Sequence, residues 1–367
     1  MLNIKKQITR LYSSSILGQL SLSGAWVAIL AARGFSLAQI GFAETIFHIV
    51  SLLSEIPSGV IADVFGRKKS LIISCLMRII GNLVMVLSNS FSMVCISFVF
   101  QAWNYNFASG SDDALAYDSL KSVGQEDRFE KYASNQLIIY RLCEGSSLLL
   151  AGFSLFLGYR IAYSASVIFA LVQLAILAGL TEVRIDESSD AGISEERNIF
   201  REIIQCFKES FLFLHQARKA LFMMFANSLI GAFDILLLFF LQAKLPMAGI
   251  PKWALGLSLL VMQAGGVLGA RLILRVKKLG YKAVFLIASM LILSGIAVEH
   301  SGLYVLMTLG GFIAALADDA LQVRTNARLQ EMFPSDQRAT LISIESFTFS
   351  CIMIILSPLA GMFFEWW

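Results

Sequence analysis

Apolar runs long enough to cross a bilayer follow one another along almost the whole chain. A helix that spans the hydrocarbon core needs about 20 apolar residues. Eleven segments meet this length: 9–32, 37–62, 70–88, 91–115, 131–157, 160–182, 218–243, 252–275, 281–298, 301–322 and 338–363. Charged residues make up only 15% of the sequence, whereas a soluble domain carries about 25%. The sequence therefore predicts an all-α polytopic membrane protein.

The chain carries no pattern typical of an enzyme or a nucleic-acid-binding protein. It has no Ser-His-Asp set, no cluster of metal ligands, no nucleotide-binding loop of the form G-x-x-x-x-G-K-[ST] and no basic stripe with interleaved aromatics. The five cysteines lack paired spacing, which favours small core residues over disulfides or a metal site: Cys75, Cys95, Cys143, Cys206 and Cys351. We expect no enzymatic activity, no cofactor and no nucleic-acid partner.

Lysine and arginine predict the orientation. With a cytoplasmic N-terminus, most of the 29 basic residues lie on the cytoplasmic side. The opposite side then holds four of them: Arg33, Arg160, Lys244 and Lys252. This asymmetry follows the positive-inside rule. The start, MLNIKKQITR, precedes an apolar run too long for a signal-peptide core, so we expect a retained first helix.

One connection is much longer than the others. Residues 183–217 begin acidic and Ser-rich and continue with apolar residues at helical spacing, which predicts a cytoplasmic linker with an amphipathic helix. It separates an N-terminal six-helix bundle, 1–182, from a C-terminal bundle of five helices, 218–367. SDDAL at 111–115 recurs as ADDAL at 317–321, each at the end of the fourth span of its half. Such parallel repeats are a transporter architecture.

Residues 58–71, SGVIADVFGRKKSL, place glycines and charges in a tight loop between the second and third spans. Gly59, Asp63, Gly66, Arg67 and Lys68 fit the pattern G-x-x-x-D-x-x-G-R-[KR]. This pattern resembles the signature of the major facilitator superfamily. The longer segments EIPSGVIADVFGRKK, SGSDDALAYDSL and SDQRATLIS resemble its bacterial branch that includes drug-efflux members.

The residue types of this motif suggest a structural role for each position. Gly59 allows close helix approach, Asp63 can cap the N-terminus of a neighbouring helix, and Gly66 supplies the turn. The resemblance implies that the motif latches the inner gate in the outward-open state. The alternative is that Arg67 and Lys68, with the next lysine, only anchor the topology.

The resemblance implies two pseudo-symmetric helical bundles and a secondary active transporter. We expect proton-coupled export of drug-like or amphipathic small molecules by alternating access. The alternatives are an importer or uniporter of a small metabolite and a non-transporting degenerate paralogue. The implied partners are a small-molecule substrate, protons and the lipid bilayer. The implied setting is a monomer, multi-pass in the bacterial plasma or inner membrane.

The sequence departs from the family pattern in two ways. The family has twelve spans, so a twelfth is missing here and a truncated product is an open alternative. In proton-driven exporters the fourth span usually carries an arginine and the fifth a glycine–proline run. This chain has Gln101 and Trp103 in the fourth span and no proline in RLCEGSSLLLAGF.

Ionisable side chains inside the spans are candidates for function because each costs about 2.5–3.5 kcal/mol at mid-membrane. Glu44, His48 and Glu55 share one face of the second span. Arg141 and Glu144 are three residues apart, so they can pair. With Asp234, these are the candidates for proton coupling or charged-substrate binding. The alternatives are a permanent ion pair that fixes packing and, for His48, a satisfied polar residue.

Two further sets complete the candidate residues. Charges near the inner edge predict inter-domain gate contacts rather than substrate ligands: Asp112, Asp113, Asp118, Arg128, Asp318, Asp319, Arg324, Arg338 and Glu345. Polar and aromatic residues within spans could line a broad cavity: Gln19, Trp26, Gln101, Tyr105, Asn227 and Gln263.

Overall fold

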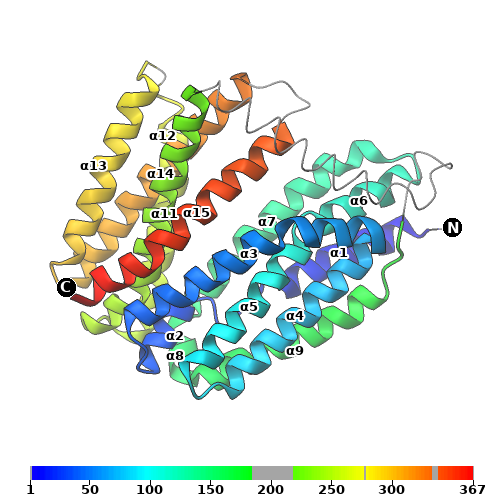
Figure 1. The fold of residues 1–367 in the computed structure, drawn as a ribbon, viewed down its shortest axis with the longest axis horizontal. Helices are drawn as coiled ribbons and strands as arrows, with labels where there is room; N and C mark the ends of the chain where they lie inside the picture. Colours follow the sequence, from blue (N-terminus) through cyan, green and yellow to red (C-terminus); the bar gives the residue numbers. More distant parts are fainter. Residues whose placement is uncertain (1, 184–217, 277, 333–337, 367) are drawn as a thin grey trace. The chain divides into compact units, whose positions relative to one another are not determined.

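The computed structural model describes residues 2–183, 218–276, 278–332 and 338–366, and its regular elements are all helices. They are α1 (Ile4–Gln19), α2 (Trp26–Ala32), α3 (Leu37–Phe65), α4 (Arg67–Leu87), α5 (Phe91–Ala108), α6 (Ser111–Lys121), η1 (Glu126–Arg128), α7 (Phe129–Leu149), α8 (Ala151–Leu157), α9 (Tyr159–Ala178), α11 (Arg218–Met247), α12 (Lys252–Leu272), α13 (Tyr281–Glu299), α14 (Tyr304–Met332) and α15 (Arg338–Trp366) (Figure 1). The amphipathic helix predicted in the linker, and Cys206 with it, fall on residues 184–217, outside the described residues. The side chains of Asp63 and Arg338 are also outside them.

The predicted all-helical membrane fold is confirmed. Within the described ranges, eight helices are long and apolar enough to cross a membrane. The number is nine if Glu126–Leu149 and Ala151–Leu157, which are bent relative to each other, count together as one span. Three predicted spans are interrupted. Span 9–32 is divided between α1 and α2, and span 91–115 between α5 and α6. Span 131–157 is divided between α7 and α8, which are bent by 50°.

Serine side chains connect the break between α1 and α2 to the break between α7 and α8. The Ser21 backbone N–H donates to Ser147 Oγ at 3.2 Å, and the Ser154 hydroxyl donates to the Leu22 carbonyl. Non-helical backbone at membrane depth persists only where protein or a wet cavity meets its polar groups. The serines provide such partners, so both breaks can lie inside the bundle.

Local sequence explains where several helices begin and end. Ser36 caps α3 in a reciprocal capping box with Gln39, which satisfies two N–H groups that the first turn leaves free. Gly66 has φ 105° between α3 and α4, and Gly158 has φ 85° between α8 and α9. Residues with a side chain rarely adopt such angles, so these glycines set the two tight turns.

Contacts divide the chain into two compact units. Unit 1 comprises Met1–Ile185, Gln242–Leu260 and Ser357–Trp367, and unit 2 comprises Asp186–Leu241 and Val261–Leu356. The division into bundles 1–182 and 218–367 stays a prediction.

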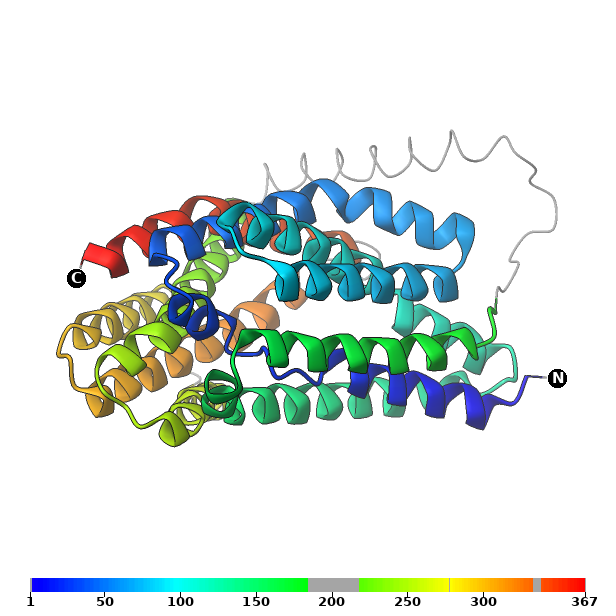
Figure 2. The same ribbon diagram turned by 90° about the horizontal axis from the view of Figure 1, so that it is seen from below.

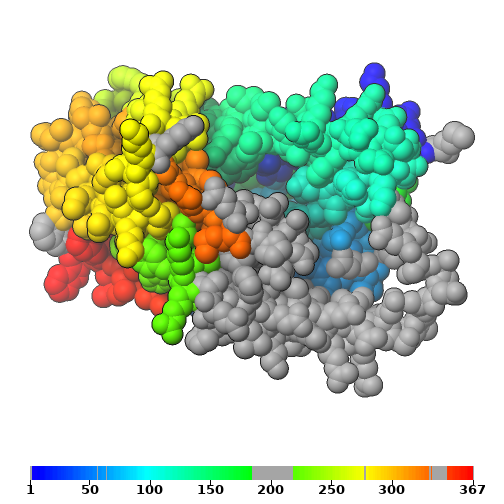
Figure 3. Space-filling view, turned by 90° about the horizontal axis from the view of Figure 1, so that it is seen from above, coloured from blue at the N-terminus to red at the C-terminus, as the bar shows by residue number. Residues whose placement is uncertain are grey.

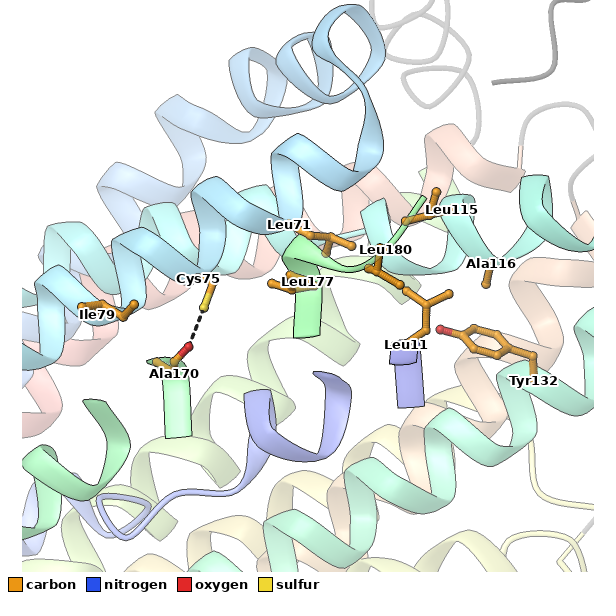
Figure 4. Close-up of a cluster of buried hydrophobic side chains, with 10 residues drawn as sticks. All are labelled: Leu11, Leu71, Cys75, Ile79, Leu115, Ala116, Tyr132, Ala170, Leu177 and Leu180. Carbon is orange, nitrogen blue, oxygen red and sulfur yellow. Dashed lines mark hydrogen bonds between the residues drawn. The ribbon is translucent and has the colours of Figure 1, made fainter. Parts of the chain in front are cut away.

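The core of unit 1 forms where α1 and α4 pack against α9 and α1 also contacts α7 (Figure 2). Leu11, Leu115 and Leu177 are almost fully buried in it. Figure 4 shows the cluster, in which the Cys75 thiol donates to the Ala170 carbonyl at 3.1 Å. Cys75 is thus a free, buried core residue, as its sequence spacing predicts.

Glycines also bring the ends of α12 and α15 close to other helices of unit 1. A side chain at Gly41 would collide with the Ser357 carbonyl, and one at Gly361 with the Leu37 carbonyl. One at Gly256 would meet the carbonyl of Leu149, the last residue of α7. Small residues at such crossings let helix backbones approach closely.

Unit 2 is built around α14, which packs against α12 and α13. A side chain at Gly265 would collide with the Phe312 carbonyl, and one at Gly269 with the Leu316 carbonyl. Gly295 of α13 and Gly310 of α14 meet backbone to backbone. The outward side chains of α13, such as Met290 at 68% exposure, are at the molecular surface (yellow in Figure 3), as expected of a lipid-facing helix.

Candidate functional site

Polar residues follow one face of α3. Glu44 Oε1 and His48 Nε2 are 3.4 Å apart, and His48 is buried. One turn further, the Ser51 hydroxyl donates to Asn106 Oδ1 at 2.7 Å, and Asn106 Nδ2 donates to the Ser51 carbonyl at 2.6 Å. The structure therefore places Glu44 beside His48 and fixes Ser51 to α5. The roles expected for Glu44 and His48 stay predictions.

The predicted contact between Arg141 and Glu144 is present on α7. Arg141 Nη1 lies 3.3 Å from Glu144 Oε2, and the Arg141 side chain is 62% exposed. The Tyr140 hydroxyl is 3.5 Å from Glu144 Oε1, and the Arg141 guanidinium carbon lies 5.6 Å from the centre of the Tyr140 ring. Tyr140, Arg141 and Glu144 therefore form one charged and aromatic group.

Residues of α3 and α5, two helices that pack against each other, lie within electrostatic range of this group. The Glu55 carboxylate of α3 is within electrostatic range of the Tyr105 hydroxyl of α5, and Tyr105 is within range of Tyr140. Tyr105 is 58% exposed and Tyr140 43% exposed. We call the five residues Glu55, Tyr105, Tyr140, Arg141 and Glu144 the aromatic–acid face. Figure 3 shows side chains of the chain region that includes α7, in teal, at the surface.

Unit 2 contains a group of three carboxylates, which we call the acidic core: Asp234, Asp318 and Asp319. Asp234 of α11 is within electrostatic range of both aspartates of α14. The glycines opposite make room for them. A Cβ at Gly231 would stand 3.3 Å from Asp318 Oδ1, and a side chain at Gly266 would collide with the Asp319 carboxylate. The sequence pattern makes Asp234 a coupling candidate and the other two inner-gate candidates, and it gives no sign that the three lie close together.

Asn227 extends the same face of α11. It lies one turn before Gly231 and two turns before Asp234, at helical spacing. Its Nδ2 donates to Glu345 Oε1 of α15 at 2.8 Å. The cavity candidate Asn227 and the inner-gate candidate Glu345 are therefore direct partners inside unit 2.

The motif between α3 and α4 has a partner that sequence reasoning missed. Glu182, just after α9, accepts from the backbone N–H groups of Arg67 and Lys68, each at 2.9 Å. Lys68 Nζ donates to the Ala178 carbonyl at 2.9 Å. A carboxylate at a helix N-terminus satisfies free N–H groups and complements the helix dipole. The sequence did hold one sign of this contact. Glu182 ends the sixth predicted span on the cytoplasmic side, which is also the side predicted for the motif.

One detail of the motif differs from expectation. A side chain at Gly59 would meet no other atom within 4 Å in the part of the chain that the structure describes. The close helix approach expected at Gly59 is therefore not seen, because that side of α3 is open. The capping role expected of Asp63 stays a prediction, since its side chain is not among those that the structure describes.

The remaining inner-gate candidates lie near helix ends or, as Arg324 of α14 does, bind the chain that follows a helix. Asp112 and Asp113 form the first turn of α6, after Gly110 at φ 70°. Arg128 ends η1 and is exposed. Arg324 donates to the carbonyls of Leu279, Ile273 and Val276, at 3.2, 3.3 and 2.8 Å. Asp118 lies in the last turns of α6.

Two of the other cavity candidates, Trp26 and Gln101, contact neighbouring helices. The Trp26 ring packs edge-on against Phe98 at 5.1 Å, and Gln101 Nε2 donates to Asn82 Oδ1 at 3.1 Å. Gln19 Oε1 is buried and has no hydrogen-bond partner among the described residues. Gln263 is partly buried in α12.

Arg78 is a second residue whose position the sequence did not explain. It is 8% exposed in α4, and Nη2 donates to the Leu17 carbonyl at 2.9 Å while Nη1 donates to the Gly18 carbonyl. A cation at a helix C-terminus is favoured by the helix dipole. Arg78 therefore stabilises the end of α1 at the first interruption.

Among the described residues, no group of three or more His, Cys, Asp or Glu is placed to hold a metal ion.

Comparison with known proteins gives one family. The family model described as the Major Facilitator Superfamily matches residues 11–358. The uncharacterized MFS-type transporter YxaM of Bacillus subtilis (strain 168) is 30% identical over 140 residues, which are 37% of this chain and 34% of that protein. The match therefore spans about a third of that relative.

Solved structures share the fold. The crystal structure of nucleoside transporter NupG has a TM-score of 0.71 at 16% identity, covering 100% of this chain and 92% of that chain. The crystal structure of a D-xylose-proton symporter has a TM-score of 0.65 at 14% identity, covering 98% and 89%. At these identities the likeness concerns the fold alone.

Proposed function

The chain belongs to the major facilitator superfamily, and on this premise we propose that it is a proton-coupled secondary transporter that exports amphipathic small organic molecules by alternating access. The observation that carries the proposal is the acidic core of unit 2, in which Asp234 lies within electrostatic range of Asp318 and Asp319. The working setting is a bacterial cell membrane, with the N-terminus in the cytoplasm.

The acidic core suits proton coupling for an energetic reason. A charged carboxylate in a membrane helix is costly, so such residues mark ion and proton pathways. Carboxylates that approach one another repel when all are charged, and one bound proton removes part of this repulsion. Binding and release of a proton would then change with the hydration of α11 and α14, which is what a coupled transporter requires.

Import of a small metabolite is the second candidate. It is favoured by two of the similar structures, which are those of a nucleoside transporter and a D-xylose-proton symporter. Export is favoured by three segments that resemble drug-efflux members: EIPSGVIADVFGRKK, SGSDDALAYDSL and SDQRATLIS. The two candidates differ in whether substrate moves with or against the proton.

A flux experiment tests the proposal. The full chain is reconstituted in liposomes, and a panel of cationic, anionic and neutral compounds is assayed under an imposed pH gradient of either sign. We expect substrate to accumulate on the acidic side, as in antiport, and collapse of the gradient to abolish accumulation. Accumulation on the alkaline side would instead indicate symport, and flux indifferent to the gradient would indicate a uniporter. No flux of any compound would favour the non-transporting paralogue.

Variants link the flux to the acidic core. In Asp234→Asn we expect gradient-driven accumulation to fall at least tenfold, while substrate exchange without a gradient persists. The matched control is Glu126→Gln, since Glu126 is exposed in η1. Equal coupling in Asp234→Asn and in the control would count against the acidic core as the coupling site.

A further inference from the structure

We infer that the substrate is an amphipathic organic cation and that it binds at the aromatic–acid face of unit 1. This inference rests on the proposed transport function and names its substrate class. The first observation behind it is that two charged side chains, Arg141 and Glu144, are exposed at membrane depth.

Charged side chains of the aromatic–acid face are exposed at membrane depth. The Arg141 side chain is 62% exposed and Glu144 is 31% exposed, although both lie in the middle of the predicted span 131–157. Charged side chains at this depth face a water-filled cavity or the bundle interior rather than lipid. Since these side chains are exposed, the cavity is the remaining setting. A solute from the cavity can therefore reach them.

The charges of this face favour a cation. Glu55 and Glu144 bring two carboxylates and Arg141 one guanidinium, so a neutral or anionic guest would leave an acid uncompensated. The Arg141 guanidinium lies 3.3 Å from Glu144, which satisfies one acid and weakens the attraction of Arg141 for an anionic guest. Glu55 of α3 lies within electrostatic range of Tyr105.

The aromatic rings favour an organic guest. Tyr105 and Tyr140 are exposed, and the Phe47 ring lies 6.0 Å from Tyr105. A cation over an aromatic face gains about 0.5–2 kcal/mol, depending on how far it is desolvated. The Arg141 guanidinium already stands 5.6 Å from the Tyr140 ring, so that ring accepts a cation in this structure.

The apolar part of the guest also has a partner. Leu137 is 59% exposed and precedes Tyr140 and Arg141 by three and four residues, which puts it on the same side of α7. A lipophilic cation could lay its apolar groups on Leu137 and the tyrosine rings while its charge meets Glu55 and Glu144. A sugar would find few hydrogen-bonding amides among these residues.

A pair of ions with the same shape and opposite charge tests the inference. Tetraphenylphosphonium and tetraphenylborate are measured by equilibrium dialysis against the purified full chain, with protein-free micelles as the blank. We expect tetraphenylphosphonium to bind at least tenfold more tightly. In the double variant Glu55→Gln/Glu144→Gln its affinity should fall at least tenfold, and in Tyr140→Leu several-fold. Tyr140→Phe, which keeps the ring, should bind as the parent does.

Two controls show whether a loss of affinity comes from the aromatic–acid face itself. Glu126→Gln removes one exposed acid outside the face and should leave both affinities unchanged, and a melting curve for each variant checks folding. Equal binding of the two ions would overturn the inference. Unchanged tetraphenylphosphonium affinity in the folded double variant would overturn it too.

The outcome is separable from that of the proposed function. If nucleosides, sugars or anions move under the pH gradient while tetraphenylphosphonium does not bind, the substrate class is wrong and the transport proposal stands. If tetraphenylphosphonium binds with the expected variant pattern but no compound moves, the binding face stands and the transport proposal fails.

Discussion

At the residue scale, Glu182 is the contact that most affects the α3–α4 motif. Its two oxygens accept from the Arg67 and Lys68 N–H groups, each at 2.9 Å. Losing a capping side chain costs about 0.5–2 kcal/mol. We therefore expect Glu182→Ala to lower the Tm of the purified protein, and Glu182→Gln to lower it less. Glu130→Ala, an exposed acid in the first turn of α7, is the control. A Tm loss equal to that of the control would contradict the capping role.

Arg78 gives a second prediction at this scale. Arg78→Met removes the donors to the Leu17 and Gly18 carbonyls, and each buried group left unsatisfied costs about 1–3 kcal/mol. We expect a lower Tm and a smaller folded yield than for Arg160→Met, where the arginine is exposed. Folded yield is read as the monodisperse peak in size-exclusion chromatography. Wild-type behaviour of Arg78→Met would show that water satisfies the two carbonyls.

Sequence spacing predicted the contacts made within one helix and missed those made between helices. Arg141 and Glu144 are three residues apart, so helical geometry alone brings them together. The approach of Asp234 to Asp318 depends instead on which faces of α11 and α14 meet. At this approach Gly231 of α11 makes room for Asp318, and one sequence does not say which glycine faces which aspartate.

At the element scale, α12 and α14 of unit 2 approach closely at the glycines of α12. A side chain at Gly269 would collide with the Leu316 backbone, which cannot yield as a side chain can. We expect Gly269→Val to cost about 1–3 kcal/mol or more and to reduce the folded yield sharply. Gly280→Ala is the matched control, since a Cβ there meets nothing within 4 Å and its φ is −66°. Equal yields of the two variants would contradict the α12–α14 crossing.

The existence and type of the elements were predictable, and the interruptions were not. A run of about 20 apolar residues predicts a spanning helix, and the long helices fall on the predicted spans. The breaks between α1 and α2 and between α7 and α8 leave apolarity unchanged, so hydropathy carries no sign of them. Their signal is the serines, such as Ser21 and Ser147, which bond across the two breaks.

At the scale of the whole molecule, the alternation of helices predicts on which side of the membrane each connection lies. The positive-inside pattern places Lys69 and Lys278 in the cytoplasm and Arg160 and Ser301 outside, and all four are exposed. Each is replaced by cysteine in a variant whose five native cysteines are serine. We expect a membrane-impermeant maleimide added to intact cells to label Arg160→Cys and Ser301→Cys. Lys69→Cys and Lys278→Cys should react only after permeabilisation.

The two inner positions test more than orientation. Lys69 follows the second span of the N-terminal half, and Lys278 follows the second span of the C-terminal half, at the degraded repeat of the motif. If the halves are parallel repeats, both lysines must lie on one side. Labelling of Lys278→Cys from outside, with Lys69→Cys protected, would mean that the halves are inverted. The acidic core and the aromatic–acid face could then not serve one alternating-access cycle in the way proposed, because the corresponding spans of the two halves would run in opposite directions.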